Sequence, residues 1–187
     1  MRPSAKKPPM SKESLLPLLM GHVLAHGLGQ ASLRPLAKAA GTSDRMLLYH
    51  FGTKEKLIAE LLTFAAGVYA AGLEAVITGD ARPATRAALL ARILEQNAGP
   101  ESQPFKQLWW EIVGGAARDL PGFRPAARAM VDELLVWLER NMPEGDPDPA
   151  GGARLLLTVI EGAMMLSSLD HEESALQGML AGGLLEA

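Results

Sequence analysis

The chain has 187 residues and a formal net charge of −3, with 48% hydrophobic and 21% charged residues. This balance is typical of a soluble globular protein and argues against a disordered chain. The absence of cysteine excludes disulfides and thiolate metal sites. No run of 18 uncharged apolar residues predicts a membrane span, and the first ten residues lack the apolar stretch of a signal peptide. We therefore expect a cytoplasmic protein that binds no membrane.

The charges are divided unevenly along the chain. Residues 1–57 hold nine Lys and Arg against three Asp and Glu, whereas residues 58–187 hold nine against eighteen. A basic N-terminal part on an acidic body is the asymmetry expected if only the first part contacts a polyanion. Chance clustering of basic residues is the alternative.

The N-terminal residues predict an arm followed by a helix. Residues 1–10 contain three prolines and three cations, and we expect a flexible basic arm there. Apolar residues at helical spacing predict a helix over 14–26, ended by Gly27. A proline in a helix interior costs about 3 kcal/mol, so the helix either starts near Ser14 or bends at Pro17.

Two short helices joined by a tight turn are predicted at 33–40 and 44–49. Ser32 is the predicted N-cap of the first helix. Gly41 can adopt a positive φ at the end of that helix, and Ser43, like its neighbour Thr42, offers an oxygen that caps the second. A helix-turn-helix is the simplest interpretation of this stretch.

Three short motifs around this turn carry a family resemblance. They are Gly41-Thr42-Ser43, Tyr49-His50-Phe51, and Gly52-Thr53-Lys54 with Leu57. The segment AAGTSDRMLLYHFGTKEKLIAELL that contains them resembles the DNA-binding segment of the TetR family of bacterial transcriptional repressors. Members often carry two aromatic residues before the histidine, but this chain has Leu48 and then Tyr49.

The second helix of this segment suits the major groove of double-stranded DNA. Lys54 is expected to contact phosphate, and Arg45 and Met46 to contact base edges. Asp44 could accept a hydrogen bond from cytosine or cap the helix, and we favour capping; His50 could contact phosphate or close the turn. The residues predicted to bind DNA are Ser32, Arg34, Thr42, Ser43, Arg45, Met46, Tyr49, His50 and Lys54.

The rest of the chain is also helical by pattern. Too many helix breakers fall within 143–152 for anything but a loop. The further predicted helices cover 54–78, 84–97, about 105 to 118–122, 124–141, 153–169 and 172–185. We predict an all-α fold with three parts, namely the arm at 1–10, a helix-turn-helix domain at 11–53, and a ligand-binding and dimerisation domain at 54–187.

Both helices at 124–141 and 153–169 are apolar over more than one stripe. This predicts that they pair with the same helices of a second subunit, which the TetR resemblance also implies. The alternative is that both faces belong to the core of one subunit.

The resemblance implies a homodimeric repressor that is released from operator DNA by a small, largely apolar ligand. Large or adaptable side chains that could surround such a ligand are Phe64, Phe105, Trp109, Met130, Trp137 and Met164. For any one of them, a place in the ordinary core is the simpler interpretation. A transcriptional activator and a helical ligand-binding protein remain alternatives.

An enzyme is much less favoured than a regulator. The sequence has no nucleophile elbow, phosphate loop or HExxH motif, and Glu111 and Glu161 are the only carboxylates worth testing. His22, His26 and His171 lack a convincing ligand pattern, so we predict no metal site and no cofactor.

Overall fold

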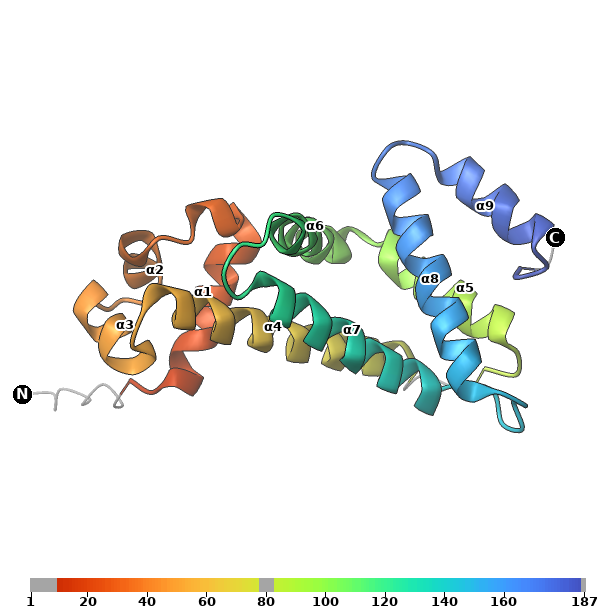
Figure 1. The fold of residues 1–187 in the computed structure, drawn as a ribbon, viewed down its shortest axis with the longest axis horizontal. Coiled ribbons are helices and arrows are strands. Elements are labelled where there is room, and N and C mark those ends of the chain that lie inside the picture. Colours follow the sequence, from red (N-terminus) through yellow and green to blue (C-terminus); the bar gives the residue numbers. More distant parts are fainter. Residues whose placement is uncertain (1–9, 78–82, 186–187) are drawn as a thin grey trace, which may run out of the picture. The chain divides into compact units, whose positions relative to one another are not determined.

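The computed structural model of the protein describes residues 10–77 and 83–185, which form helices and no strand (Figure 1). The all-α prediction is confirmed. The chain divides into two compact units, one of Met1–Ala65 with Gln107–Ala126 and one of Ala66–Lys106 with Ala127–Ala187. The arm predicted at 1–10 lies outside the described residues, apart from Met10. The functional boundary predicted between residues 53 and 54 stays a prediction.

The first unit contains the N-terminal helices and parts of three longer ones (Figure 1). Each of its first four helices buries at least one leucine completely, and these include Leu15, Leu36, Leu47 and Leu57. The elements are α1 (Lys12–His26), η1 (Leu28–Gln30), α2 (Leu33–Ala39), α3 (Asp44–Phe51), the start of α4 (Lys54–Ile77), most of α6 (Gln103–Ala117) and the start of α7 (Phe123–Arg140).

Helix α1 begins two residues before the predicted start at Ser14. Ser11 is its N-cap, and Ser11 and Ser14 form a capping box in which each side chain bonds to the backbone of the other. Pro17 therefore lies in the interior of the helix, where it removes one backbone hydrogen bond. The buried face of α1, with Leu15 and Leu19 fully buried, offsets that loss.

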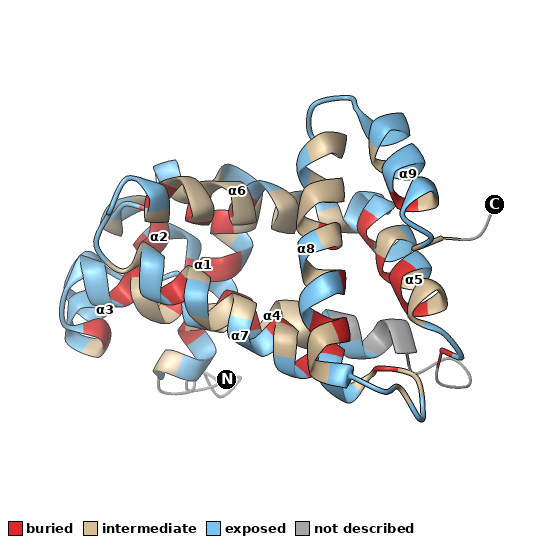
Figure 2. Ribbon diagram, turned by 45° about the vertical axis from the view of Figure 1, so that its right-hand side comes forward, coloured by how far each residue is buried: buried red, intermediate tan, exposed pale blue. Residues whose placement is uncertain are grey.

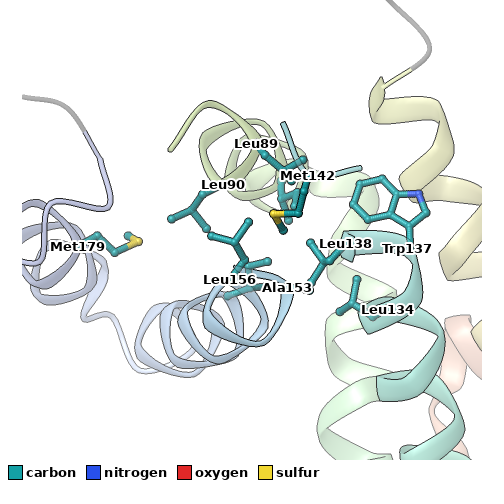
Figure 3. Close-up of a cluster of buried hydrophobic side chains, with 11 residues drawn as sticks. Leu89, Leu90, Leu134, Trp137, Leu138, Met142, Ala153, Leu156 and Met179 are labelled. Atoms are coloured by element: carbon teal, nitrogen blue, oxygen red, sulfur yellow. The ribbon is translucent and has the colours of Figure 1, made fainter. Parts of the chain in front are cut away.

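The second unit is organised around one hydrophobic cluster (Figure 3). The cluster contains residues of α5 (Arg86–Ala98), α7, α8 (Pro149–Ser167) and α9 (Glu172–Ala181). A short helix, η2 (Pro100–Ser102), follows α5. The cluster residues are Leu89, Leu90, Ile93, Leu134, Trp137, Leu138, Met142, Ala153, Leu156, Ile160 and Met179. These side chains interdigitate between α5, α7 and α8, and Met179 reaches the cluster from α9 (Figure 3).

The predicted loop at 143–152 is wrong over its last four residues, because α8 begins at Pro149. A proline is tolerated in the first turn of a helix, where its missing N–H would have no partner. The Asp148 side chain caps the helix by accepting from the Gly151 N–H at 2.9 Å. Arg86 adds a tertiary anchor, since its guanidinium donates to both oxygens of Asp146 at 2.6 and 2.7 Å and to the Asp148 carbonyl at 2.9 Å.

The other helix ends agree with the predictions to within a few residues. Helix α5 starts at Arg86 because Thr85 caps it, with 3.1 Å between the Ala88 N and the Thr85 Oγ1. Helix α9 stops at Ala181, four residues before its predicted end, because Gly183 adopts a φ of 67°. The predicted end of α4 at Thr78 lies outside the described residues.

Among the described residues, α8 is the one helix long and apolar enough to cross a membrane by length and composition alone. It packs against α5 and α9, and its residues Ala153, Leu156 and Ile160 belong to the hydrophobic cluster of the second unit.

Candidate DNA-binding surface

The turn between α2 and α3 is built by local interactions. Gly41 adopts a φ of 62°, and the Thr42 N–H donates to the Ala37 carbonyl at 2.9 Å. Ser43 is the N-cap of α3, and its Oγ accepts from the Met46 N–H at 3.3 Å. The capping role predicted for Asp44 is therefore wrong. Asp44 is the first helical residue and is exposed, because the serine before it already supplies the capping oxygen.

One side of α3 anchors it to the first unit. Leu47 is fully buried and Phe51 nearly so. The Lys12 ammonium lies 5.4 Å from the centroid of the Phe51 ring and also bonds to Glu60 Oε1 at 2.6 Å. Helix α3 ends at Gly52, which has a φ of 82° and donates its N–H to the Leu48 carbonyl. These contacts hold the opposite face of α3 in a fixed position.

That opposite face is exposed to solvent (Figure 2). Arg45, Leu48 and Tyr49 share it at helical spacings of three and four residues, and Met46 lies beside Tyr49. The exposed fraction is 78% for Tyr49, 38% for Met46 and 37% for Leu48, which is unusual for three large side chains on an eight-residue helix. Such a face is available to a macromolecular partner.

His50 lies between the two faces. It is half-buried, and its ring meets the Tyr49 ring edge-on with 5.2 Å between centroids. Its Nε2 is buried without a hydrogen-bond partner, so this nitrogen is shielded from solvent. The geometry supports a role for His50 in closing the end of α3 more than it supports a phosphate contact through Nε2.

The start of α4 places a cation at a helix N-terminus. Lys54 is the first residue of α4 and is exposed, and Thr53 Oγ1 accepts from the Lys56 N–H at 3.2 Å. The partial positive charge of a helix N-terminus adds to the lysine charge, and both favour an anion such as phosphate.

The other residues predicted to bind DNA come shortly before α3 in the sequence. Ser32 and Arg34, at the start of α2, are exposed, and Ser32 makes no side-chain capping bond although it occupies the N-cap position. Thr42 is half-buried and Ser43 uses its oxygen in the cap. Leu48, which the prediction did not include, is exposed three residues after Arg45.

Residues 23–61 match the family described as bacterial regulatory proteins, tetR family. The match spans the end of α1, both helices of the helix-turn-helix, and the start of α4. This segment of the chain is similar to the TetR family. The predicted resemblance is thereby confirmed, and the first unit carries the matching helix-turn-helix segment.

Solved structures extend the similarity over nearly the whole chain. A transcriptional regulator from Rhodococcus sp. Rha1 is 25% identical, with a TM-score of 0.67, and the match covers 93% of this chain and 97% of that one. The multidrug binding protein EbrR, solved in complex with proflavin, is 21% identical, with a TM-score of 0.66 over 91% of this chain and 98% of that one. The second likeness shows a shared fold. A comparison with curated proteins finds no match.

The residues predicted to surround a ligand fall in both units. Trp137 belongs to the cluster of the second unit and Met164 packs against it. Phe105 and Met130 also belong to the second unit. Phe64 and Trp109 belong to the first unit. All six are at least half-buried, and Trp137 is 3% exposed.

Polar groups border the cluster of the second unit. The indole Nε1 of Trp137 is buried without a hydrogen-bond partner and faces away from the cluster (Figure 3). Asn97 is buried, and its amide lies 3.7 Å from the Met164 sulfur. Tyr69 packs against the same cluster, where burial and then the charge of Glu161 raise the pKa of its hydroxyl to about 12. The second unit therefore combines an apolar cluster with a few polar groups at its border.

Glu111, one of the two carboxylates considered for catalysis, has a hydrogen-bond partner in the first unit. Glu111 accepts from the Leu28 N–H at 2.8 Å, which is a structural role. Among the described residues, no three His, Cys, Asp or Glu side chains gather as metal ligands would.

Proposed function

We propose that this protein is a homodimeric transcriptional repressor that acts in the cytoplasm and is released from its operator by a small, largely apolar ligand. The single observation that carries the proposal is the outer face of α3. It exposes Arg45 and Tyr49 on a helix whose other side is anchored by buried residues, within a TetR-family segment.

The electrostatics of the first unit support DNA as the partner. Arg45 is exposed near the start of α3 and Lys54 is exposed just after its end, and the sequence up to residue 57 has nine basic residues against three acidic ones. Arg45 is suited to pair with guanine through two hydrogen bonds. Lys54 and the N-terminus of α4 are suited to hold phosphate, which fixes the position of the helix in the groove.

A single short recognition helix reads only a few base pairs, which supports a dimer. A stripe on α8 is available for such pairing, since Leu155 is 40% exposed, Met165 49%, and Leu169, just beyond the helix, 61%. Thr158 and Gly162 complete the stripe at spacings of three and four residues. Exposed large apolar residues on one face are typical of a subunit interface. Val136 on α7 and Leu176 on α9 are further exposed apolar residues of the same unit.

Ligand control is supported by the composition around the second cluster. Tyr69, Trp137 and Met164 provide aromatic and polarizable surface there. The similar fold of EbrR was solved with proflavin, which supports the same use here. A ligand releases DNA only if it binds better to an arrangement of the subunits that no longer fits the operator.

Fluorescence anisotropy at several salt concentrations tests the proposal. The DNA flanking the protein's own gene is compared with scrambled DNA, using the parent, a Tyr49→Ala, Lys54→Ala double variant, and Arg128→Ala on α7 as a control. We expect the parent and the control to prefer the native DNA and the double variant to lose that preference. Equal binding to native and scrambled DNA at every salt concentration would favour a helical ligand-binding protein instead.

A reporter gene behind the bound DNA separates the repressor from the alternative of an activator. We expect expression to rise when the protein is removed. A fall in expression would identify an activator, because the sign of regulation depends on where the operator lies relative to the promoter.

A further inference from the structure

Leu48 lies on α3, the helix proposed to enter the major groove, and no base contact has been assigned to its side chain so far. It lies on the exposed side of α3, three residues after Arg45 and next to Tyr49, and 37% of it is accessible. On the other side of the same helix, Leu47 and Phe51 form the anchor. Leu48 therefore contributes less than Leu47 and Phe51 to holding α3 in place.

The side chains that flank Arg45 and Tyr49 are apolar on both edges. Leu48 lies on one edge and Met46, 38% exposed, on the other. Neither side chain can donate a hydrogen bond, and leucine cannot accept one. Contacts of Leu48 with phosphate oxygens or with the hydrogen-bonding groups of base edges would therefore bring no attraction.

The major groove has one apolar feature that differs between base pairs, and this is the 5-methyl group of thymine. An apolar side chain next to an arginine on the same helix face is suited to a thymine that lies beside a guanine. The charge of Arg45 and the basic N-terminal sequence commit this face to DNA rather than to an apolar protein partner.

We propose that Leu48 is a specificity-determining residue that reads thymine methyl groups, and that the operator half-site places a thymine beside the guanine read by Arg45. The inference rests on the proposed function, because it concerns the same helix in the same groove. It adds the identity of the base feature and the residue that recognises it.

The test first selects bound sequences from a random DNA pool with the full-length protein. Each thymine of the selected half-site is then replaced by deoxyuridine, which removes the methyl group and leaves every hydrogen-bonding group in place. We expect the loss of one contacted methyl group to weaken binding by about three- to tenfold, the size expected for one buried carbon group. In Leu48→Ala, thymine and deoxyuridine at that position should bind equally.

Leu18→Ala on α1 is the matched control, since Leu18 is an exposed leucine of the same unit, 51% accessible, outside the recognition helix. This variant should keep the parent's preference for thymine, and thermal unfolding should show that both variants are folded. If the parent binds a selected sequence but treats thymine and deoxyuridine alike at every position, the inference is overturned while the proposed function stands. The inference also fails if Leu48→Ala keeps the full preference. If no sequence is selected from the pool, the proposed function fails and the inference fails with it.

Discussion

The carboxylate of Glu111 accepts a hydrogen bond from the backbone N–H of Leu28, with 2.8 Å between Oε2 and N. Leu28 begins the turn that links α1 to α2, and Glu111 lies in α6, 83 residues later in the chain. Helix α6 therefore helps to fix the turn that precedes the helix-turn-helix.

Replacing Glu111 with alanine should lower the free energy of unfolding by about 1–2 kcal/mol, because the partly buried N–H of Leu28 loses its acceptor. Urea unfolding followed by circular dichroism measures the change. Glu111→Gln should retain most of the stability, because its amide oxygen can still accept. An alanine variant as stable as the parent would show that water replaces the carboxylate without loss.

Gly27 should not tolerate a side chain. Its φ of 78° and ψ of 165° belong to a region that is nearly restricted to glycine, and an added Cβ would lie 2.6 Å from Glu111 Oε1. Gly27→Ala should therefore destabilise the protein by about 1–3 kcal/mol, as measured by its melting temperature and urea midpoint. The control is Gly21→Ala in the exposed face of α1, where nothing lies within 4 Å. That variant should gain up to about 1 kcal/mol, because alanine is the better helix former. A loss of similar size in both variants would contradict the explanation.

The ion pair of Arg86 and Asp146 should make stability depend on pH in the acid range. The hydrogen bonds from the Arg86 guanidinium are the main cause that lowers the pKa of Asp146 from 3.8 to about 2. Since the carboxylate is favoured in the folded state, its contribution is complete above about pH 4 and is lost as the pH falls towards 2. Urea midpoints measured across this range should fall less steeply for Asp146→Asn than for the parent. Parallel curves would show that other carboxylates account for the acid sensitivity.

Two substitutions in the DNA-binding segment should differ in kind. Lys54→Ala should weaken binding to all sequences and reduce the dependence of log K on log salt by about one unit, because one phosphate contact is lost. Arg45→Ala should relax the preference at one base pair by about 1–3 kcal/mol. Anisotropy titrations with native and single-base variant DNA at four salt concentrations distinguish the two effects. Identical salt slopes for Lys54→Ala and the parent would remove Lys54 from the phosphate contacts.

The exposed stripe on α8 should control the oligomeric state. Met165→Glu places a charge in the middle of the apolar stripe, so the dimer should dissociate at micromolar concentration. Sedimentation velocity measures the change, and DNA affinity should fall with it because a single recognition helix remains. Leu120→Glu, an exposed leucine of the first unit with 40% accessibility, serves as the control and should stay dimeric. A dimeric Met165→Glu variant would place the interface on another face.

The helix-turn-helix could be predicted closely because its signals act within a few residues. Gly41 needs only its own positive φ, and Ser43 caps α3 through the N–H of Met46, three residues later. The capping role was also assigned to Asp44, which was wrong, because two adjacent residues offered suitable oxygens and local chemistry alone did not rank them.

Contacts between distant residues could not be predicted in the same way. Asp148 and Pro149 look like loop residues, yet they start α8 because Arg86, about sixty residues earlier, binds this segment. Glu111 stood out as a possible catalytic carboxylate, and no sequence pattern connects it to Leu28. Which partner a carboxylate finds depends on how the helices pack.

The sequence by itself determined the all-α class, the position of the helix-turn-helix and the resemblance to the TetR family, because helical periodicity, capping and the turn motif are local properties of the chain. Only the tertiary structure decided which side of each helix is buried against the rest. Burial of Leu47 and Phe51 turns Arg45, Leu48 and Tyr49 outwards, and burial of Leu156 and Ile160 leaves Leu155 and Met165 exposed. In a helix with apolar residues on several faces, the packing of its neighbours determines which of those residues remain available for a partner.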